Sequence, residues 1–149
     1  MDYFKKFLFL FVFLISASTA NASTSEFVGV IGAAIGDIKN QNNEKLINGS
    51  KIFYGDTIIS DAQSNAQILF LDQTVLTLGE DTELTIDEFI YDPSNHEGSF
   101  VSNVKSGTVK FITGQISNKN PDNLEVKIPS GTLGAVSYTH LTLPTIYSV

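Results

Sequence analysis

The residues most able to do chemistry are acidic and gather in one short stretch. This acidic stretch contains Glu80, Asp81, Glu83, Asp87 and Glu88. A carboxylate pair can serve in acid–base catalysis, and an oxygen-rich loop can hold Ca²⁺. The stretch lacks the D-x-D-x-D-G pattern of a calcium loop. We therefore interpret these side chains as the solvated face of a strand.

Other reactive side chains lack partners at a useful spacing. His96 is the single histidine before position 135, and without cysteine a transition-metal site would need several carboxylates. No serine lies in a G-x-S-x-G motif. We interpret Gly29, Gly32 and Gly36 as positions of close strand packing, because the Lys-Ser/Thr of a phosphate loop does not follow them. The sequence thus predicts no catalytic residue, metal site or cofactor, and a protein that is not an enzyme.

Short strands separated by turns are the elements available to position these residues. Between Asn48 and Phe89, apolar and β-branched segments alternate with Gly, Asn or Asp turns about every ten residues. Asn48-Gly49 is the strongest turn signal; with Ser50 it also fits an N-glycosylation acceptor. No segment shows sustained helical periodicity. We predict an all-β, single compact domain of short antiparallel strands, either a sandwich or a short β-coil.

The pattern also predicts particular strands and pairings. We expect strands at 27–38, 44–47, 51–54, 57–60, 66–71, 74–78, 84–91, 99–105, 108–113 and 124–128. We expect 57–60 to pair with 66–71, and 99–105 to form a hairpin with 108–113 around Ser106-Gly107. Leu69 and Leu71 lie on the second face of an apolar strand, which predicts a strand that is central in its sheet or covered on both sides. Residues 114–123 are polar and predict a mobile loop.

The first 22 residues have the pattern of a secretory signal peptide. Lys5 and Lys6 precede an apolar run, and Ala20-Asn21-Ala22 fits a signal-peptidase site, which predicts cleavage before Ser23. The apolar run is far shorter than the roughly 20 residues of a membrane-spanning helix. We expect an exported protein, periplasmic or extracellular, that is not integral to the membrane after cleavage.

Composition narrows the possible partners of the remaining 127 residues. That length is enough for one domain with its own core. Removing the signal changes the formal charge from −7 to −8, and every basic residue is lysine. The absence of arginine argues against nucleic acid as a partner. Since the chain has no cysteine, packing rather than disulfides must hold the exported fold together.

The order of short motifs from Val28 to Gly134 resembles the FecR domain, a periplasmic module of regulators of iron-uptake signalling. The matching segments are Leu46-x-x-Gly49, Gly55-Asp56-Thr57-Ile58, Ser64–Asp72, Leu76-Thr77-Leu78, Glu83-Leu84-x-Ile86 and Pro129–Gly134. The resemblance implies one FecR-like all-β domain over residues 23–134. A departure is Gln73, where the family usually has glycine after the aspartate of the central turn.

The tail at residues 135–149 departs further from that pattern. The family's closing strand usually continues with a basic residue and Gly-Thr, whereas this chain continues AVSYTHLTLPTIYSV. From Ser137 the run resembles a translated sequencing-adapter artefact; a genuine strand is the alternative, because its residues favour strands. We expect a non-native tail and a natural protein that continues beyond it, and we assign no function to Tyr138 or His140.

The resemblance implies a non-enzymatic, exported binding or signalling-type module whose partner is a protein or a cell-envelope component. The anti-sigma segment and membrane helix of the regulators find no counterpart in this sequence, so we do not expect that role to carry over. The alternatives are a structural adhesin or envelope scaffold domain and a calcium-dependent carbohydrate binder. An exposed sheet edge is the expected working surface. Tyr54, Phe89 and Tyr91 could anchor a partner there or close the ends of the core.

Overall fold

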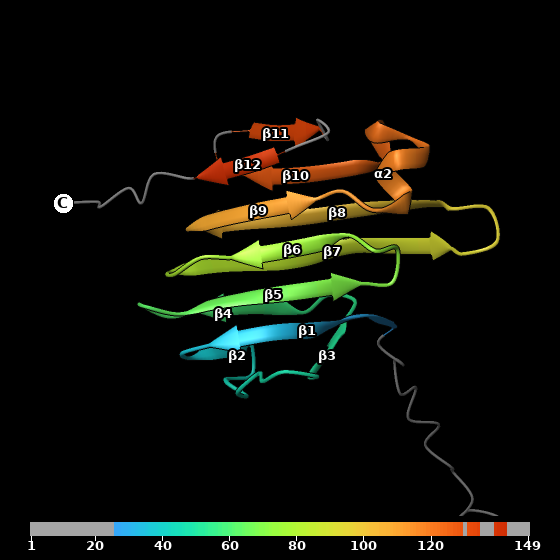
Figure 1. Cartoon of the computed structure of the whole chain (residues 1–149). Coiled ribbons are helices and arrows are strands. Elements are labelled where there is room, and N and C mark those ends of the chain that lie inside the picture. Colours follow the sequence, from blue (N-terminus) through green and yellow to red (C-terminus); the bar gives the residue numbers. More distant parts are fainter. Residues whose placement is uncertain (1–25, 130, 135–138, 143–149) are drawn as a thin grey trace, which may run out of the picture.

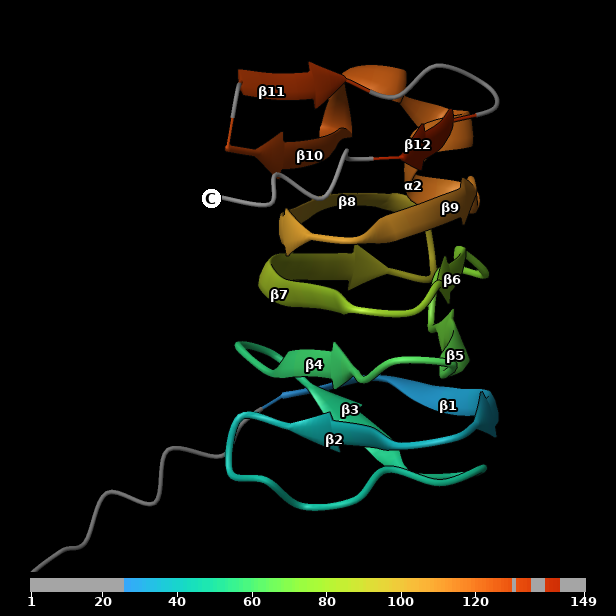
Figure 2. The same cartoon turned by 90° about the vertical axis from the view of Figure 1, so that its left-hand side faces the viewer.

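The protein is a sandwich of two six-stranded sheets, seen in a computed structural model that describes residues 26–129, 131–134 and 139–142 (Figures 1 and 2). The predicted signal peptide lies outside the described residues. Sheet A contains, from edge to edge, β12 (Thr139–Thr142), β9 (Thr108–Ile112), β6 (Val75–Leu78), β5 (Asn65–Phe70), β1 (Phe27–Ile35) and β3 (Lys51–Phe53). Sheet B contains β11 (Gly131–Gly134), β10 (Leu124–Ile128), β8 (Glu97–Ser106), β7 (Thr82–Asp92), β4 (Thr57–Ser60) and β2 (Ile38–Asn40). The all-β prediction is confirmed.

Both sheets turn an apolar face inward, and these two faces make one core. Strand alternation puts every second side chain on the same face, and the inward set includes Ile68 and Leu76 of sheet A and Leu84 and Ile86 of sheet B, all fully buried. Phe100 lies among three other buried phenylalanines, with its ring centroid 4.6 Å from that of Phe70. Leu78, Leu124 and Val126 follow the same inward alternation.

Residues in the left-handed backbone conformation, with positive φ, lie where the chain passes from one sheet to the other. The crossings β1–β2, β3–β4, β4–β5, β6–β7 and β8–β9 use one to four residues each. Each crossing has a residue with positive φ: Gly36, Gly55, Gln63, Asp81 and Gly107, with φ between 51° and 90°. Such residues reverse the chain tightly. The predicted turns therefore lie where expected, although many of them join sheets instead of neighbouring strands.

Two predicted pairings are wrong for this reason. Strand β4 pairs with β2 and β7 in sheet B, whereas β5 pairs with β1 and β6 in sheet A. Strands β8 and β9 likewise lie in different sheets, and the hairpin partner of β8 is β7. At the β8–β9 crossing, a Cβ on Gly107 would collide with Thr82 at the start of β7, the neighbour of β8 in sheet B. A short turn between two apolar segments fits a hairpin and a crossing equally well, so the local pattern could not distinguish them.

Three other local expectations also need correction. The apolar run 27–38 is two strands in different sheets, because the chain turns at Gly36. Residues 44–47 form only an isolated bridge between Lys45 and Lys39. Residues 114–123 contain the short helix α2 (Gln115–Lys119) and the 3₁₀ turn η1 (Pro121–Asn123). The antiparallel expectation holds for every described strand pair except β8–β10, which is parallel.

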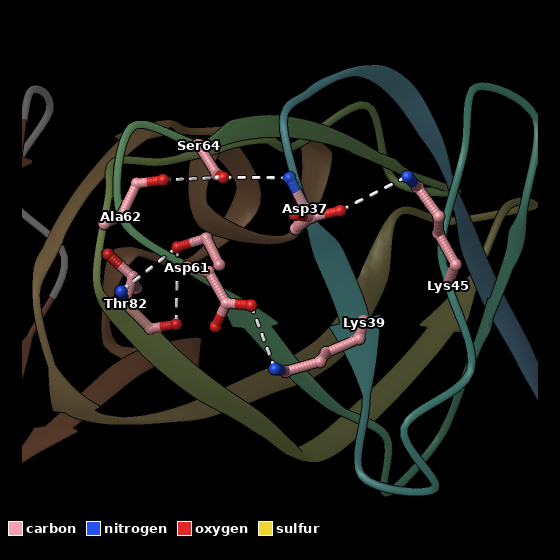
Figure 3. A network of polar contacts seen from close by, with 8 residues as sticks. Asp37, Lys39, Lys45, Asp61, Ala62, Ser64 and Thr82 are labelled. Atoms are coloured by element: carbon pink, nitrogen blue, oxygen red, sulfur yellow. Dashed lines mark hydrogen bonds and ion pairs between the residues drawn. The ribbon is translucent and has the colours of Figure 1, made fainter.

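Polar side chains tie the corners together (Figure 3). The Ser64 hydroxyl accepts a hydrogen bond from the backbone N–H of Asp37 at 2.9 Å, across the β1–β2 and β4–β5 corners. The Asp37 carboxylate lies 3.2 Å from Lys45 Nζ, and the Asp61 carboxylate lies 2.9 Å from Lys39 Nζ. These pairs are partly exposed, so their contribution to the free energy of folding is small. Their effect is to align two corners that are distant in sequence.

A second corner is held by buried hydroxyl groups. The Ser60 hydroxyl donates to the Gly79 carbonyl at 2.5 Å and accepts from the Thr82 N–H at 3.1 Å. The Thr82 hydroxyl accepts from the Thr108 N–H at 3.0 Å. Ser60 and Thr82 are almost fully buried. Because unpaired buried backbone groups are costly, these two side chains satisfy the backbone at the β6–β7 and β8–β9 crossings.

A buried carboxylate holds α2 against the end of the sandwich. Asp72, in the β5–β6 turn, is fully buried and accepts hydrogen bonds from the backbone N–H and hydroxyl of Thr74 at 3.0 and 2.8 Å. Its Oδ2 atom also accepts from the Ile116 N–H at 3.4 Å, and its backbone carbonyl accepts from the Gln115 N–H at 2.7 Å. The residue before the helix, Gly114, offers no side chain for capping. Asp72 therefore caps a helix that begins more than forty residues later.

We expect Asp72→Ala to lower the free energy of unfolding by about 2–3 kcal/mol, because it leaves the Thr74 and Ile116 donors without their acceptor. The exposed Asp122→Ala is the control and should change stability by less than about 0.5 kcal/mol. Urea unfolding followed by circular dichroism measures both variants. Equal losses in the two would contradict the capping role.

The turn residue Gln73 departs from the family's usual glycine and has φ = 70°. Glycine adopts this conformation without steric cost, so Gln73→Gly should raise the free energy of unfolding by about 1 kcal/mol. Gln67→Gly, in the middle of β5, is the control and should lower it by about 0.5–1 kcal/mol. A loss of stability in Gln73→Gly would show that this turn does not demand glycine.

Candidate interaction surface

The acidic stretch lies along β7 and the turn before it, on the outer face of sheet B. Glu80 and Asp81 are in the turn, where Glu80 accepts a hydrogen bond from the Gln63 N–H at 2.9 Å. Glu83 lies 2.7 Å from Lys105 Nζ, and Asp87 lies 3.7 Å from Lys127 Nζ. Glu88 faces the same side beyond a bulge. Among the described residues, no group of three or more His, Asp or Glu side chains could hold a metal ion.

The hairpin tip between β7 and β8 holds His96, whose ring contacts Tyr91. The Tyr91 hydroxyl lies 2.9 Å from His96 Nδ1, and the two rings stack with centroids 6.3 Å apart. In the same exposed turn, hydrogen bonds from the Ser94 hydroxyl and backbone N–H lower the pKa of Asp92. These contacts shape a turn, since all of them are local.

The glycines near the N-terminus pack against strands, as the sequence predicts. A Cβ on Gly29 would lie 2.5 Å from the Leu69 carbonyl oxygen, and one on Gly32 would lie 3.0 Å from the Leu69 side chain. Asn48-Gly49 forms the predicted turn, and the Asn48 side chain accepts a hydrogen bond from the Ala34 N–H at 2.7 Å. These residues therefore have structural roles in the region described.

The three aromatic residues proposed as anchors differ in how exposed they are in the structure. Phe89 is buried in the phenylalanine cluster of the core. Tyr91 is half-buried against the core and hydrogen-bonded to His96. Tyr54 is 49% exposed, and its backbone N–H donates to Glu26 beside the start of β1. Only Tyr54 keeps the exposure that an anchor requires.

The edges of the sandwich that the structure describes in full are short. Strands β2 and β3, at one end of the stack in Figure 2, have three residues each. On the β2 side, the Leu46 N–H donates to the Ile38 carbonyl at 2.8 Å, and the Asn40 N–H donates to the Glu44 carbonyl at 3.0 Å. Residues 44–46 thus already occupy that edge, which leaves little backbone for strand addition.

The outer face of sheet A carries a row of apolar side chains that crosses its strands. Val30 pairs with Leu69, Leu69 with Val75, and Val75 with Ile112. Direct cross-strand partners lie about 5 Å apart, so the row is continuous. Leu69 is 40% exposed and Ile112 48% exposed, whereas their neighbours Ile68 and Phe111 point into the core. We call Val30, Leu69, Val75 and Ile112 the apolar row.

More exposed apolar residues adjoin this row at one end of β5. Leu71 is 49% exposed, and its backbone N–H donates to the Val28 carbonyl at 3.0 Å, which places it next to the start of β1. There Phe27 is 36% exposed and packs edge-on against Phe53. The prediction that 66–71 is central in its sheet or covered on both sides is confirmed by its central position between β1 and β6, while its second face is open to solvent. The second apolar side of this strand is nevertheless the sequence signal that could have found the surface.

Lysines border the apolar row at both ends. Lys51 of β3 pairs with Val30, and its Nζ atom lies 6.0 Å from the centre of the Phe27 ring. Lys110 of β9 lies two residues from Ile112 and points to the same side. They are the only charged residues in β3, β1, β5, β6 and β9. In contrast, the outer face of sheet B carries Lys39, Glu83, Asp87, Glu88, Lys105, Glu125 and Lys127.

Comparison with known proteins identifies the family. No helix among the described residues is long and apolar enough to cross a membrane. No curated protein and no solved structure matches the chain. The family model described as FecR protein matches residues 56–144, more than half of the chain, and this stretch contains most of both sheets. The resemblance of the short motifs is thereby confirmed, and the chain belongs to the FecR family.

Proposed function

We propose that this protein is an exported, non-enzymatic binding module that acts through contact with a protein or cell-envelope component. The observation that carries the proposal is the exposed apolar row on sheet A. Apolar side chains spread continuously over one face mark interaction sites in soluble proteins, whereas isolated ones do not. Membership of the FecR family supports a regulatory or signalling role, and the N-terminal signal pattern supports export.

The apolar row is not required by the fold itself. The core is formed by the inward faces, and the outward positions of sheet B show that polar and charged residues suit the same architecture. Leu69 and Ile112 keep 40% and 48% of their surface in water, so part of the gain of full burial, about 1.5–3 kcal/mol per side chain, is not realised. A partner that covers the row would recover part of that free energy.

The surface can be tested by photo-crosslinking in the cells that export the protein. p-Benzoyl-phenylalanine placed at Leu69 or Ile112 should cross-link to one defined protein or envelope component, identified by mass spectrometry. Ile90 is the matched control, because it is 59% exposed but lies on β7 of sheet B. Cross-links that are absent, or equally frequent from Ile90, would contradict the proposal. Cross-links only between copies of this chain would instead support the envelope scaffold.

The acidic stretch gives a separate prediction, because Glu83 and Asp87 are already matched by lysines. A Ca²⁺ site needs six to eight oxygen ligands from a suitable loop. Calorimetric titration of Ca²⁺ into the protein should therefore give no saturable heat. Saturable heat that disappears in the Glu80→Ala/Asp81→Ala variant would revive the calcium-dependent carbohydrate binder.

A further inference from the structure

We infer that the occupant of the apolar row is an amphipathic helix with acidic residues at both ends of its apolar stripe. The inference rests on the proposed function and adds the chemistry of the partner. Three features of sheet A lead to it: where its backbone hydrogen bonds go, where its charges lie, and how far the row extends.

The backbone of sheet A restricts which structures can lie on its face. In the centre of the sheet, β1, β5, β6 and β9 each hydrogen-bond to a strand on either side. The face therefore offers side chains but no backbone donors or acceptors. A segment that docks there must satisfy its own backbone, which a helix does and an isolated extended strand does not. The mode is that of a helix with its apolar stripe against an apolar surface.

The charges on the face select an acidic partner. Lys51 and Lys110 border the row, and the five strands beneath carry no carboxylate. Carboxylates on the partner would complement these lysines and set its orientation. The protein is acidic as a whole, but charges more than about 8 Å away are largely screened at physiological ionic strength. On these five strands, the charge that a helix meets comes from Lys51 and Lys110.

The same charges argue against a second copy of the chain as the occupant. A symmetric dimer through this face would bring Lys51 and Lys110 of both copies together without a carboxylate from these strands. The outer face of sheet B is a poor cover for the row too, because it carries both lysines and carboxylates, among them Glu83, Asp87, Lys105, Glu125 and Lys127. An acidic amphipathic helix meets both the apolar and the charge requirement.

The extent of the row sets the length of the helix. The row lies on β1, β5, β6 and β9, and with Lys51 on β3 it spans five neighbouring strands, whose order can be followed in Figure 1. With strands about 4.8 Å apart, Lys51 and Lys110 lie at the ends of a span of about 19 Å. A helix rises about 1.5 Å per residue, so about 13 residues cover it. We therefore expect three to four helical turns between the acidic ends.

Two synthetic helical peptides test the inference. Both have about 13 residues and the same leucine stripe; one has glutamates at both ends and the other has lysines. The glutamate peptide should bind the protein at least about tenfold more tightly in fluorescence anisotropy at physiological salt. Lys51→Glu/Lys110→Glu should reverse the preference. Equal binding of the two peptides, or a preference unchanged by the charge reversal, would overturn the inference.

Substitutions on the outer face of sheet A test whether the peptide binds there. Leu69→Gln/Ile112→Gln should lower the affinity for the glutamate peptide at least about tenfold, whereas Ile90→Gln on sheet B should leave that affinity unchanged. All three positions are exposed, so these variants should keep the thermal unfolding midpoint of the parent protein. Binding that survives Leu69→Gln/Ile112→Gln would overturn the inference.

Two further outcomes separate this inference from the proposed function. The protein should not bind vesicles of phosphatidylcholine and phosphatidylglycerol. The contrary result would be a protein that binds the vesicles and not the peptide, and that loses this binding in Leu69→Gln/Ile112→Gln. A lipid surface would then be the occupant, and the helix would be overturned. If neither peptide binds while photo-crosslinks from Leu69 persist, the helix is refuted and the binding module stands. If the crosslinks also fail, the binding module itself is refuted.

Discussion

Short crossings between the two sheets are the constraint on which the sandwich depends. The chain has one to four residues for most of these passages, and it reverses through left-handed positions such as Gly36, Gln63 and Gly107. Each reversal leaves backbone groups at a corner, and the hydroxyls of Ser60 and Thr82 satisfy several of them. Since the chain has no disulfide to hold these corners, packing and buried hydrogen bonds maintain the alignment of the sheets.

The two outer faces differ in a way that folding alone does not explain. Both inner faces must be apolar to form the core, but either outer face can be polar without loss of packing. Sheet B has lysines and carboxylates outside, several of them paired across strands, whereas sheet A exposes Leu69 and Ile112. Among the described residues, sheet A therefore has the more apolar of the two outer faces. A partner bound there would leave the charged side and the β7–β8 hairpin free in solution.

Much of the local structure could be predicted from the sequence because it depends on neighbouring residues. The Asn48-Gly49 turn and the inward alternation of Leu84 and Ile86 follow from backbone preferences and from the two-residue period of a strand. The partner of each strand could not be predicted in the same way. The turn at Ser106-Gly107 satisfies a hairpin pattern, yet the chain crosses there from sheet B to sheet A, and Gly107 is needed because Thr82, at the start of the neighbouring strand β7, lies against it. The helix at 115–119 was missed because its cap, Asp72, lies far away in the sequence.

By itself, the sequence determined the all-β class, the positions of most turns and the FecR resemblance, because each depends on residue type and spacing. Only the tertiary structure decided which strands share a sheet, where Asp72 is buried and which face of β5 remains open. Those outcomes depend on contacts between residues far apart in the chain. The apolar row shows the difference most clearly: Val30, Leu69, Val75 and Ile112 become neighbours only when four strands are placed side by side.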